Sequence, residues 1–247
     1  MNTVYVGLEL RRIFRDYVNV FFVGVLPAFL FLIFGTQSDS SEQIGNGNVG
    51  MLIMISMAAY GAVTATTGIG GLAAVERMQG WGRQLGLTPM RDGSYVANKT
   101  LVALVVATIP IVLIYLLGAL TGASATALAW MLSGALVLVG AAVFGVYGLA
   151  VGLAFRAEAA VSTASGLLVI MAFLGNVFMP ITGTLLDIGR FTPLYGYTAL
   201  VRYPMTGGDL ESGGHDPLWM ILANVTVWAA IFVLAATHLV RRGRERQ

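Results

Sequence analysis

The chain has no cysteine, only two histidines and a single lysine among its 247 residues. The missing cysteine excludes disulfide bonds and thiolate metal sites. Charge is scarce as well: 11% of the residues are charged and 57% are hydrophobic, whereas soluble domains carry about 25% charged residues. So few charged side chains cannot cover a surface that faces water, and the composition therefore predicts an integral membrane protein.

Long apolar runs occur at six places along the chain. A bilayer core of about 30 Å requires roughly 20 apolar residues in a helix. We therefore predict an all-α, polytopic membrane protein, with a single transmembrane domain over residues 1–247. The six predicted spans are residues 18–34, 49–74, 100–120, 125–155, 159–179 and 218–240.

The basic residues gather on alternate connections between these spans. Of the fourteen lysine and arginine residues, twelve lie before span 1, between spans 2 and 3, between spans 4 and 5, or after span 6. The other two, Arg190 and Arg202, lie between spans 5 and 6. The positive-inside rule then predicts a multi-pass protein of the cytoplasmic (inner) membrane with both termini in the cytoplasm.

Two segments outside the spans have their own patterns. Residues 3–17 place apolar side chains on one helical face and predict an amphipathic helix on the inner membrane surface. Residues 180–204 are moderately apolar but contain charges, and each charge costs about 2.5–3.5 kcal/mol at the centre of a membrane helix. We predict two short re-entrant helices there, broken near Pro193, rather than a seventh span.

The connection between spans 2 and 3 is short, charged and interrupted by glycines. Glu76 and Arg77 end a long helix, and Thr88-Pro89 stops any regular structure before span 3. One interpretation is an ordinary cytoplasmic loop whose arginines reach lipid headgroups. The other is a short surface helix that docks into a soluble partner.

The motif residues of this connection resemble those of the permease subunits of ABC-2-type exporters. They are Glu76, Arg77, Gly80, Leu85, Thr88 and Pro89. The opening Leu8–Asp16, which leads into a span with Pro27, is similar to the N-terminus of that family. The stretch Phe191–Arg202 is similar to its Asn-Pro-Leu…Arg signature, with Thr192 in place of the asparagine. The resemblance covers essentially the whole chain.

The resemblance implies half of an ATP-driven exporter. Two permease chains, expected as a homodimer with a pseudo-symmetric heterodimer as the alternative, would engage two cytosolic ATP-binding-cassette subunits, which bind the ATP and magnesium. The cargo would be a drug, antibiotic, peptide or lipid-like molecule. The segment between spans 2 and 3 matches the coupling helix of the family. The expected coupling residues are Glu76, Arg77, Gly80, Arg83, Leu85, Leu87, Thr88 and Pro89.

The resemblance also places spans 2 and 5 along the transport path and closes the path with the re-entrant helices. Serine and threonine in a helix can instead bond their own backbone, so the polar residues of these spans have two interpretations. The pathway candidates are Ser56, Thr64, Thr67, Ser165 and Asn176. The candidates for the external gate are Phe178, Pro193, Tyr197 and Arg202.

The sequence predicts no catalytic or metal site, and hence a transport subunit rather than an enzyme. Residues 93–100 have the spacing of a P-loop, but Asn98 replaces its second glycine and no buried strand precedes it. His215 and the acidic residues near it are typical of a solvated turn. We therefore expect no cofactor in this chain, the lipid bilayer as its surroundings, and no nucleic-acid partner.

Two other transport classes remain open. A membrane substrate-capture subunit for vitamin uptake would bind its vitamin without an ATPase. An ion-driven secondary transporter usually has internal repeats, and residues 1–121 do not resemble residues 122–247. The spans contain no acidic pair for a proton relay, which favours an amphipathic or apolar cargo over a small ion.

Overall fold

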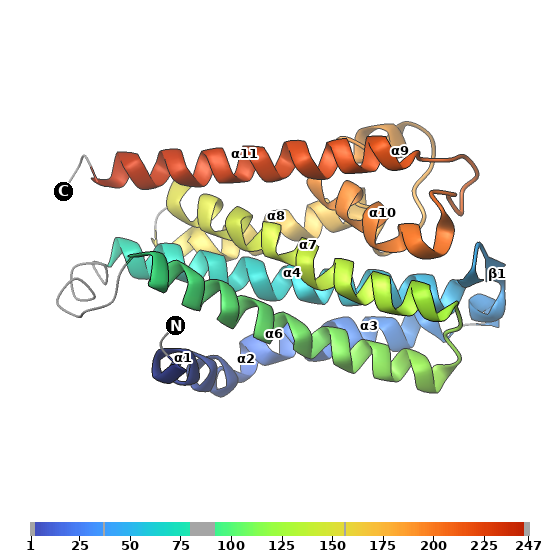
Figure 1. Cartoon of the computed structure of the whole chain (residues 1–247), viewed down its shortest axis with the longest axis horizontal. Coiled ribbons are helices and arrows are strands. Elements are labelled where there is room, and N and C mark those ends of the chain that lie inside the picture. Colours follow the sequence, from blue (N-terminus) through green and yellow to red (C-terminus); the bar gives the residue numbers. More distant parts are fainter. Residues whose placement is uncertain (1–2, 37, 80–91, 156, 245–247) are drawn as a thin grey trace.

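The computed structural model describes residues 3–36, 38–79, 92–155 and 157–244, and these form a helical bundle (Figure 1). The first part of the chain comprises α1 (Thr3–Arg15), α2 (Tyr17–Val20), the π-helix η1 (Phe21–Val25), α3 (Leu26–Gly35), the 3₁₀-helix η2 (Ser38–Ser41), β1 (Gln43–Ile44) and β2 (Gly47–Asn48). The remaining helices are α4 (Val49–Met78), α6 (Asp92–Thr121), α7 (Ala127–Ala154), α8 (Ala157–Leu174), α9 (Gly183–Gly189), α10 (Pro193–Thr206) and α11 (Leu218–Arg244).

Helix α4 runs through the middle of the bundle and contacts α3, α6, α7 and α8 (Figure 1). In its most apolar 18-residue window 83% of the residues are buried, against 11% in the corresponding window of α11. A helix that is apolar on every side is stable only when other elements surround it. The even distribution of apolar residues along α4 is therefore explained by its central position.

Glycines allow α4 and α7 to approach closely. A Cβ atom added to Gly148 would clash with the carbonyl oxygen of Thr67, and one added to Gly70 would clash with that of Gly145. Small residues at such crossings bring two backbones together and are the usual means of packing helices in membranes. At the same crossing, the hydroxyl of Thr67 in α4 donates a hydrogen bond to the carbonyl of Phe144 in α7 at 3.3 Å.

Asn48 fixes the start of α4 and ties it to a distant connection. Its side-chain oxygen accepts hydrogen bonds from the backbone N–H of Met51 at 3.0 Å and of Ser124 at 2.9 Å. Its amide nitrogen donates to the carbonyl of Gly122 at 2.9 Å. One N-cap residue therefore begins the central helix and holds the β1–β2 hairpin against the turn between α6 and α7.

Four helices of the described chain are long and apolar enough to cross a membrane: Val49–Met78, Asn98–Thr121, Ala127–Ala154 and Leu218–Arg242. They agree with predicted spans 2, 3, 4 and 6. The apolar helices at predicted spans 1 and 5, Phe21–Gly35 and Ala159–Leu174, are shorter and reach about 22–24 Å. The structure thus supports an all-α polytopic membrane protein, and the count of six spans stays a prediction.

The fifth predicted span ends earlier than its apolar pattern suggests. Helix α8 stops at Leu174 rather than at Met179, because Asn176 adopts a left-handed backbone with φ 57°. The side chain of Asn176 then accepts a hydrogen bond from the N–H of Ile181 at 3.2 Å, which stabilises the turn. After this turn come the short helices α9 and α10, separated at the residues just before Pro193. Their placement as re-entrant helices in a bilayer stays a prediction.

The two ends of the bundle differ in content. Helix α1, the C-terminal end of α4 and the C-terminal end of α11 lie at one end, which we call the termini end (Figure 1). The β1–β2 hairpin and helices α9 and α10 lie toward the opposite end, which we call the hairpin end (Figure 1).

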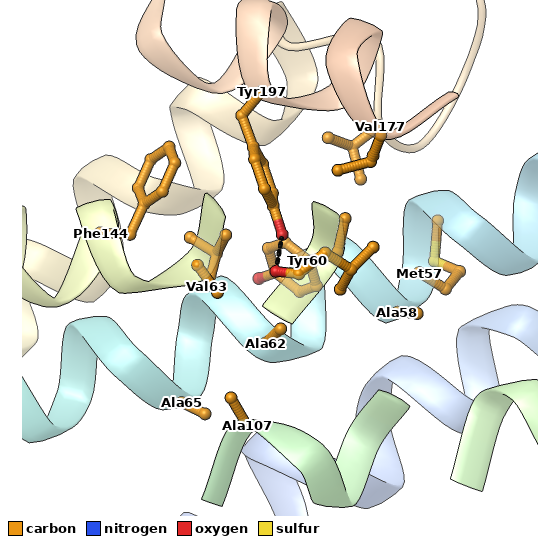
Figure 2. Packing of buried hydrophobic residues seen from close by; sticks show 14 of the residues in the cluster. Met57, Ala58, Tyr60, Ala62, Val63, Ala65, Ala107, Phe144, Val177 and Tyr197 are labelled. Atoms are coloured by element: carbon orange, nitrogen blue, oxygen red, sulfur yellow. Dashed lines mark hydrogen bonds between the residues drawn. The ribbon is translucent and has the colours of Figure 1, made fainter. Parts of the chain in front are cut away.

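Between the two ends is the apolar core. Figure 2 shows Tyr197 of α10 pointing into it, among Tyr60 and Val63 of α4 and Phe144 of α7. The Tyr197 hydroxyl donates to the carbonyl of Val137 at 2.8 Å. Helix α10 is therefore anchored in the same core as the long helices.

Candidate functional site

Four charged side chains from three helices meet at the termini end, and we call them the ion-pair cluster. They are Glu9 and Arg12 of α1, Glu76 of α4 and Lys99 of α6. The Lys99 ammonium lies 3.0 Å from a Glu9 carboxylate oxygen and 2.7 Å from one of Glu76. The guanidinium of Arg12 lies 3.0 Å from the other oxygen of Glu76. Two acids and two bases balance the charge of the cluster.

Most of this cluster is buried. The side chains of Lys99 and Glu76 are 8% and 5% exposed, whereas that of Arg12 is 59% exposed. The ring of Tyr5 lies beside Lys99, with 6.0 Å from its centroid to the ammonium. Burial, together with the nearby carboxylates of Glu9 and Glu76, raises the pKa of the Tyr5 hydroxyl. Buried charges that lose a partner are costly, so the cluster binds α1, α4 and α6 to one another.

Two residues of the ion-pair cluster flank, in the sequence, the segment that is predicted to couple to a partner. Glu76 and Arg77 belong to the last turn of α4, and Lys99 belongs to the first turns of α6. The carboxylate of Glu76 accepts a hydrogen bond from Lys99 of the same chain, and the side chain of Arg77 is half-buried. The other expected coupling residues, namely Gly80, Arg83, Leu85, Leu87, Thr88 and Pro89, lie outside the described residues.

A second polar cluster lies toward the hairpin end and joins residues that the sequence assigned to different roles. Arg202 of α10 is 9% exposed. Its guanidinium donates to the hydroxyl of Ser56 in α4 from Nε at 2.9 Å and from Nη2 at 2.6 Å. Nη2 also donates to the backbone carbonyl of Asn176 at 2.7 Å. We call Arg202, Ser56 and Asn176 the Arg202 cluster; it joins a predicted gate residue to two predicted pathway residues.

Next to the Arg202 cluster is a buried acid with two partners. Asp216 is 1% exposed and accepts a hydrogen bond from Arg190 at 2.8 Å. It also accepts one from the hydroxyl of Tyr195. Burial, and then the hydrogen bond to Asp216, raise the pKa of Tyr195, which keeps the phenol protonated as a donor. The charge of Asp216 is thus compensated by Arg190.

A pocket opens between these groups. Its polar lining includes Arg202, Asn176, Tyr195 and Asp216, and its apolar lining includes Leu52, Ala199 and Ile221. The lining comes from α4, α10, α11 and the connections around them. Its volume of about 20 Å³ holds about one water molecule and is far below the roughly 300–1,000 Å³ of small-molecule sites.

The remaining pathway candidates are placed as follows. Thr64 is half-buried and donates to the carbonyl of Tyr60 at 2.8 Å, which is a bond within its own helix. Thr67 is buried in the contact between α4 and α7. Ser165 is half-buried on α8. The structure therefore brings Ser56 and Asn176 together, and it keeps Thr64, Thr67 and Ser165 at separate places.

The remaining gate candidates pack in the apolar core. Phe178 stacks edge-on against Tyr60, with ring centroids 4.9 Å apart. Pro193 is buried at the first turn of α10, where proline suits a helix start. Tyr197 lies in the cluster of Figure 2.

Sequence reasoning did not assign Glu9, Arg12 and Lys99 to a common site. Residues 9 and 99 are separated by ninety positions, and no local pattern links them. A signal was nevertheless present, since Lys99 is the single lysine of the chain and stands at the boundary of an apolar run. Residues 92–121 form one helix, so the stretch with P-loop spacing is not a phosphate-binding loop, and its lysine is paired with two acids.

Four apolar helices long enough to span a bilayer, in a chain with few charged residues, indicate a polytopic helical membrane protein. No family model matches the sequence. Over 240 residues the chain is 25% identical to "Putative transport permease YvfS" of Bacillus subtilis (strain 168). The match covers 95% of this chain and 94% of that protein. The similarity indicates a transport permease rather than an enzyme, and it agrees with the resemblance to ABC-2-type permeases.

Proposed function

We propose that this chain is the permease subunit of an ATP-driven exporter for amphipathic or apolar molecules. It lies in the cytoplasmic membrane with both termini in the cytoplasm, and it works as a homodimer with two separate ATPase subunits. The similarity to a transport permease over nearly the whole chain supports the class. The distribution of the lysine and arginine residues supports the orientation.

The observation that carries the proposal is the ion-pair cluster. Two of its members, Glu76 and Lys99, flank residues 77–98 in the sequence and are paired with each other. A force applied to this segment reaches α4 through Glu76 and α6 through Lys99. Because Lys99 also bonds Glu9, the same force reaches α1. Three helices then move together, which is what a rigid joint between an ATPase and a transport path requires. In this proposal Glu76 transmits force inside the chain, and residues 80–91 make the contact with the partner.

The absence of cysteine permits a direct test. A single cysteine is introduced in the predicted coupling segment, as Arg83→Cys, and a matched one in the exposed turn at the hairpin end, as Ser212→Cys. Each variant is co-expressed with a candidate ATP-binding-cassette ATPase from the same organism, and inside-out vesicles are treated with a bifunctional thiol–amine reagent. We expect a cross-link to the ATPase from Arg83→Cys and none from Ser212→Cys. No cross-link from either position, or one from Ser212→Cys alone, would contradict the proposal.

Coupling is tested separately by Glu76→Gln. This change keeps the size of the side chain and removes one of the two carboxylates that hold Lys99. We expect normal membrane insertion and complex formation with the ATPase, together with a loss of transport and of permease-dependent ATP hydrolysis. Glu42→Gln, at an exposed residue near the hairpin, is the matched control and should leave both unchanged. Native levels of transport and of permease-dependent ATP hydrolysis in Glu76→Gln would contradict the proposal that Glu76 transmits force.

A further inference from the structure

Helix α1 buries one face against the bundle and leaves the opposite face exposed. The buried face carries Glu9 and Ile13. The exposed face carries Val4, Leu8 and Phe14, whose exposed fractions are 70%, 62% and 47%. Large apolar side chains on the outer side of a short amphipathic helix indicate contact with another apolar surface, either a membrane or a protein.

Two cations stand among these exposed apolar side chains. Arg11 and Arg15 lie one turn apart on the same face of α1, as about 3.6 residues per turn requires, and both are exposed. Neither makes an ion pair with a described residue. The acid of α1, Glu9, is turned to the bundle, and Asp16 adds one exposed negative charge just after the helix. The exposed face therefore combines apolar area with net positive charge.

The exposed apolar side chains continue along the chain into the part that enters the bilayer. Tyr17 and Val18 of α2 and Phe21 and Phe22 of η1 are exposed as well. The two phenylalanines belong to predicted span 1, where exposed side chains meet lipid. Helix α1 lies at the edge of the bundle at the termini end (Figure 1). A helix in this position, with these side chains outward, lies at the boundary between lipid headgroups and acyl chains.

We propose that the exposed face of α1 binds anionic phospholipid of the cytoplasmic leaflet. Val4, Leu8 and Phe14 would enter the acyl chains, and Arg11 and Arg15 would reach the phosphate groups. Arginine can do so because its long stem packs on apolar surface while its charged head stays at headgroup level. Each cation near an anionic membrane surface strengthens binding. The inference goes beyond the proposed function, since it concerns neither the ATPase nor the cargo.

The lipid contact would also act on the ion-pair cluster, because α1 supplies two of its members. Glu9 on the buried face bonds Lys99 of α6. Arg12, which is 59% exposed, bonds Glu76 of α4. A lipid that holds the outer face of α1 therefore also holds α1 against α4 and α6.

The absence of cysteine allows a single fluorescent probe to report the lipid beside α1. Gly7→Cys places the probe NBD on the exposed face, where an added Cβ meets nothing within 4 Å. The full chain, without an ATPase, is placed in nanodiscs of equal parts phosphatidylglycerol and phosphatidylcholine. A nitroxide that quenches NBD is carried on the acyl chain of one lipid or of the other. We expect a local excess of phosphatidylglycerol of about fivefold or more, because each arginine near an anionic surface contributes about that factor.

Paired variants separate the arginines of α1 from the general positive charge of this end. Arg11→Gln with Arg15→Gln should abolish the excess at position 7. The matched control, Arg241→Gln with Arg242→Gln, removes the same charge from the exposed end of α11, which lies on the other side of the bundle (Figure 1). It should leave the excess unchanged, because exposed charges are screened beyond about 10 Å. NBD at Ser212→Cys, in the turn at the hairpin end, should report no excess.

Equal quenching by the two labelled lipids at position 7 would overturn the proposal. So would an excess that survives the paired change in α1, or one that the control pair in α11 also abolishes. Quenching by neither lipid would overturn it too, and would assign this face of α1 to a protein partner.

If the paired variant of α1 does not yield folded protein, the single changes Arg11→Gln and Arg15→Gln replace it. Each should lower the excess, and an unchanged excess in both refutes the proposal. Because no ATPase is present, a failure here leaves the cross-linking result unaffected.

Discussion

The two polar clusters of this protein handle buried charge in opposite ways. At the termini end, Lys99 has two carboxylates within 3.0 Å, and the cluster contains equal numbers of acids and bases. Toward the hairpin end, the hydrogen bonds of Arg202 to the described residues go to a hydroxyl and a carbonyl. The first cluster joins helices through salt bridges, whereas Arg202 joins α10 to α4 and to the turn after α8 through hydrogen bonds to neutral groups. The two clusters thus hold the bundle at its two ends by different kinds of interaction.

The largest effect should come from removing the centre of the neutralised cluster. Lys99→Met leaves Glu9 buried and Glu76 without its main partner, and we expect a loss of about 3–5 kcal/mol in the free energy of unfolding. The measurement is equilibrium unfolding in mixed detergent micelles, followed by the fluorescence of the four tryptophans. Lys99→Arg keeps the charge and should recover most of the stability. A Met variant as stable as the native chain would mean that the cluster does not hold the helices.

A smaller effect is expected at the other cluster. Ser56→Ala removes the hydroxyl that accepts two hydrogen bonds from Arg202, and bonds to charged groups contribute about 1.5–3 kcal/mol. The same unfolding measurement applies. Thr64→Ser is the matched control on α4, since it keeps the hydroxyl that bonds the carbonyl of Tyr60 within the helix. Equal stability of Ser56→Ala and the native chain would show that the hydroxyl does not hold the guanidinium.

The two clusters share α4, and a single methyl group can disturb the close packing of α4 on α7 at Thr67. Gly148→Ala places a Cβ against the carbonyl oxygen of Thr67 and should cost about 1–3 kcal/mol of unfolding free energy. Gly68→Ala is the matched control, because a Cβ at Gly68 meets nothing within 4 Å. If both variants unfold at the same detergent fraction, the close contact of these helices is not required for stability.

The smallest effect is expected at the exposed edge of the ion-pair cluster. Arg12 is 59% exposed, and Glu76 keeps Lys99 when Arg12 is replaced. Arg12→Gln should therefore cost about 0–1 kcal/mol, as is usual for surface ion pairs. The unfolding titration is repeated at low and high salt, because only an exposed pair is screened. A loss of unfolding free energy as large as that in Lys99→Met would mean that the Arg12–Glu76 pair contributes as much to stability as the Glu76–Lys99 pair.

Much of the fold could be predicted from the sequence, because the patterns that specify its helices are local. Apolar length identified the helices of spans 2, 3, 4 and 6, and the charges of residues 180–204 pointed to two short helices instead of one long span. Helix α8 ends at Leu174, before the predicted end of span 5, because Asn176 turns the chain while the apolar pattern continues to Met179. The pair Gly175-Asn176 is a helix-stop signal, because glycine and asparagine adopt the left-handed conformation most readily, but the apolar residues on both sides outweighed it in the prediction.

The polar partners were much less predictable than the helices. Glu76 was expected to face a partner protein, and the structure places it inside the chain against Lys99 and Arg12. Ser56, Asn176 and Arg202 were chosen as separate path and gate residues, and they form one cluster. Positions 56 and 202 are 146 residues apart, so only the packing of α10 against α4 brings them together.

The sequence by itself determined that this is a helical membrane protein, where its main spans run and on which connections its positive charge is concentrated. These properties depend on composition and on periodicity within about twenty residues. The tertiary structure alone decided which charged side chains meet and which groups hold Arg202. A charge is compensated by neighbours in space, and those neighbours are set by the close crossing of α4 with α7 and by the docking of α1 and α10 onto the bundle.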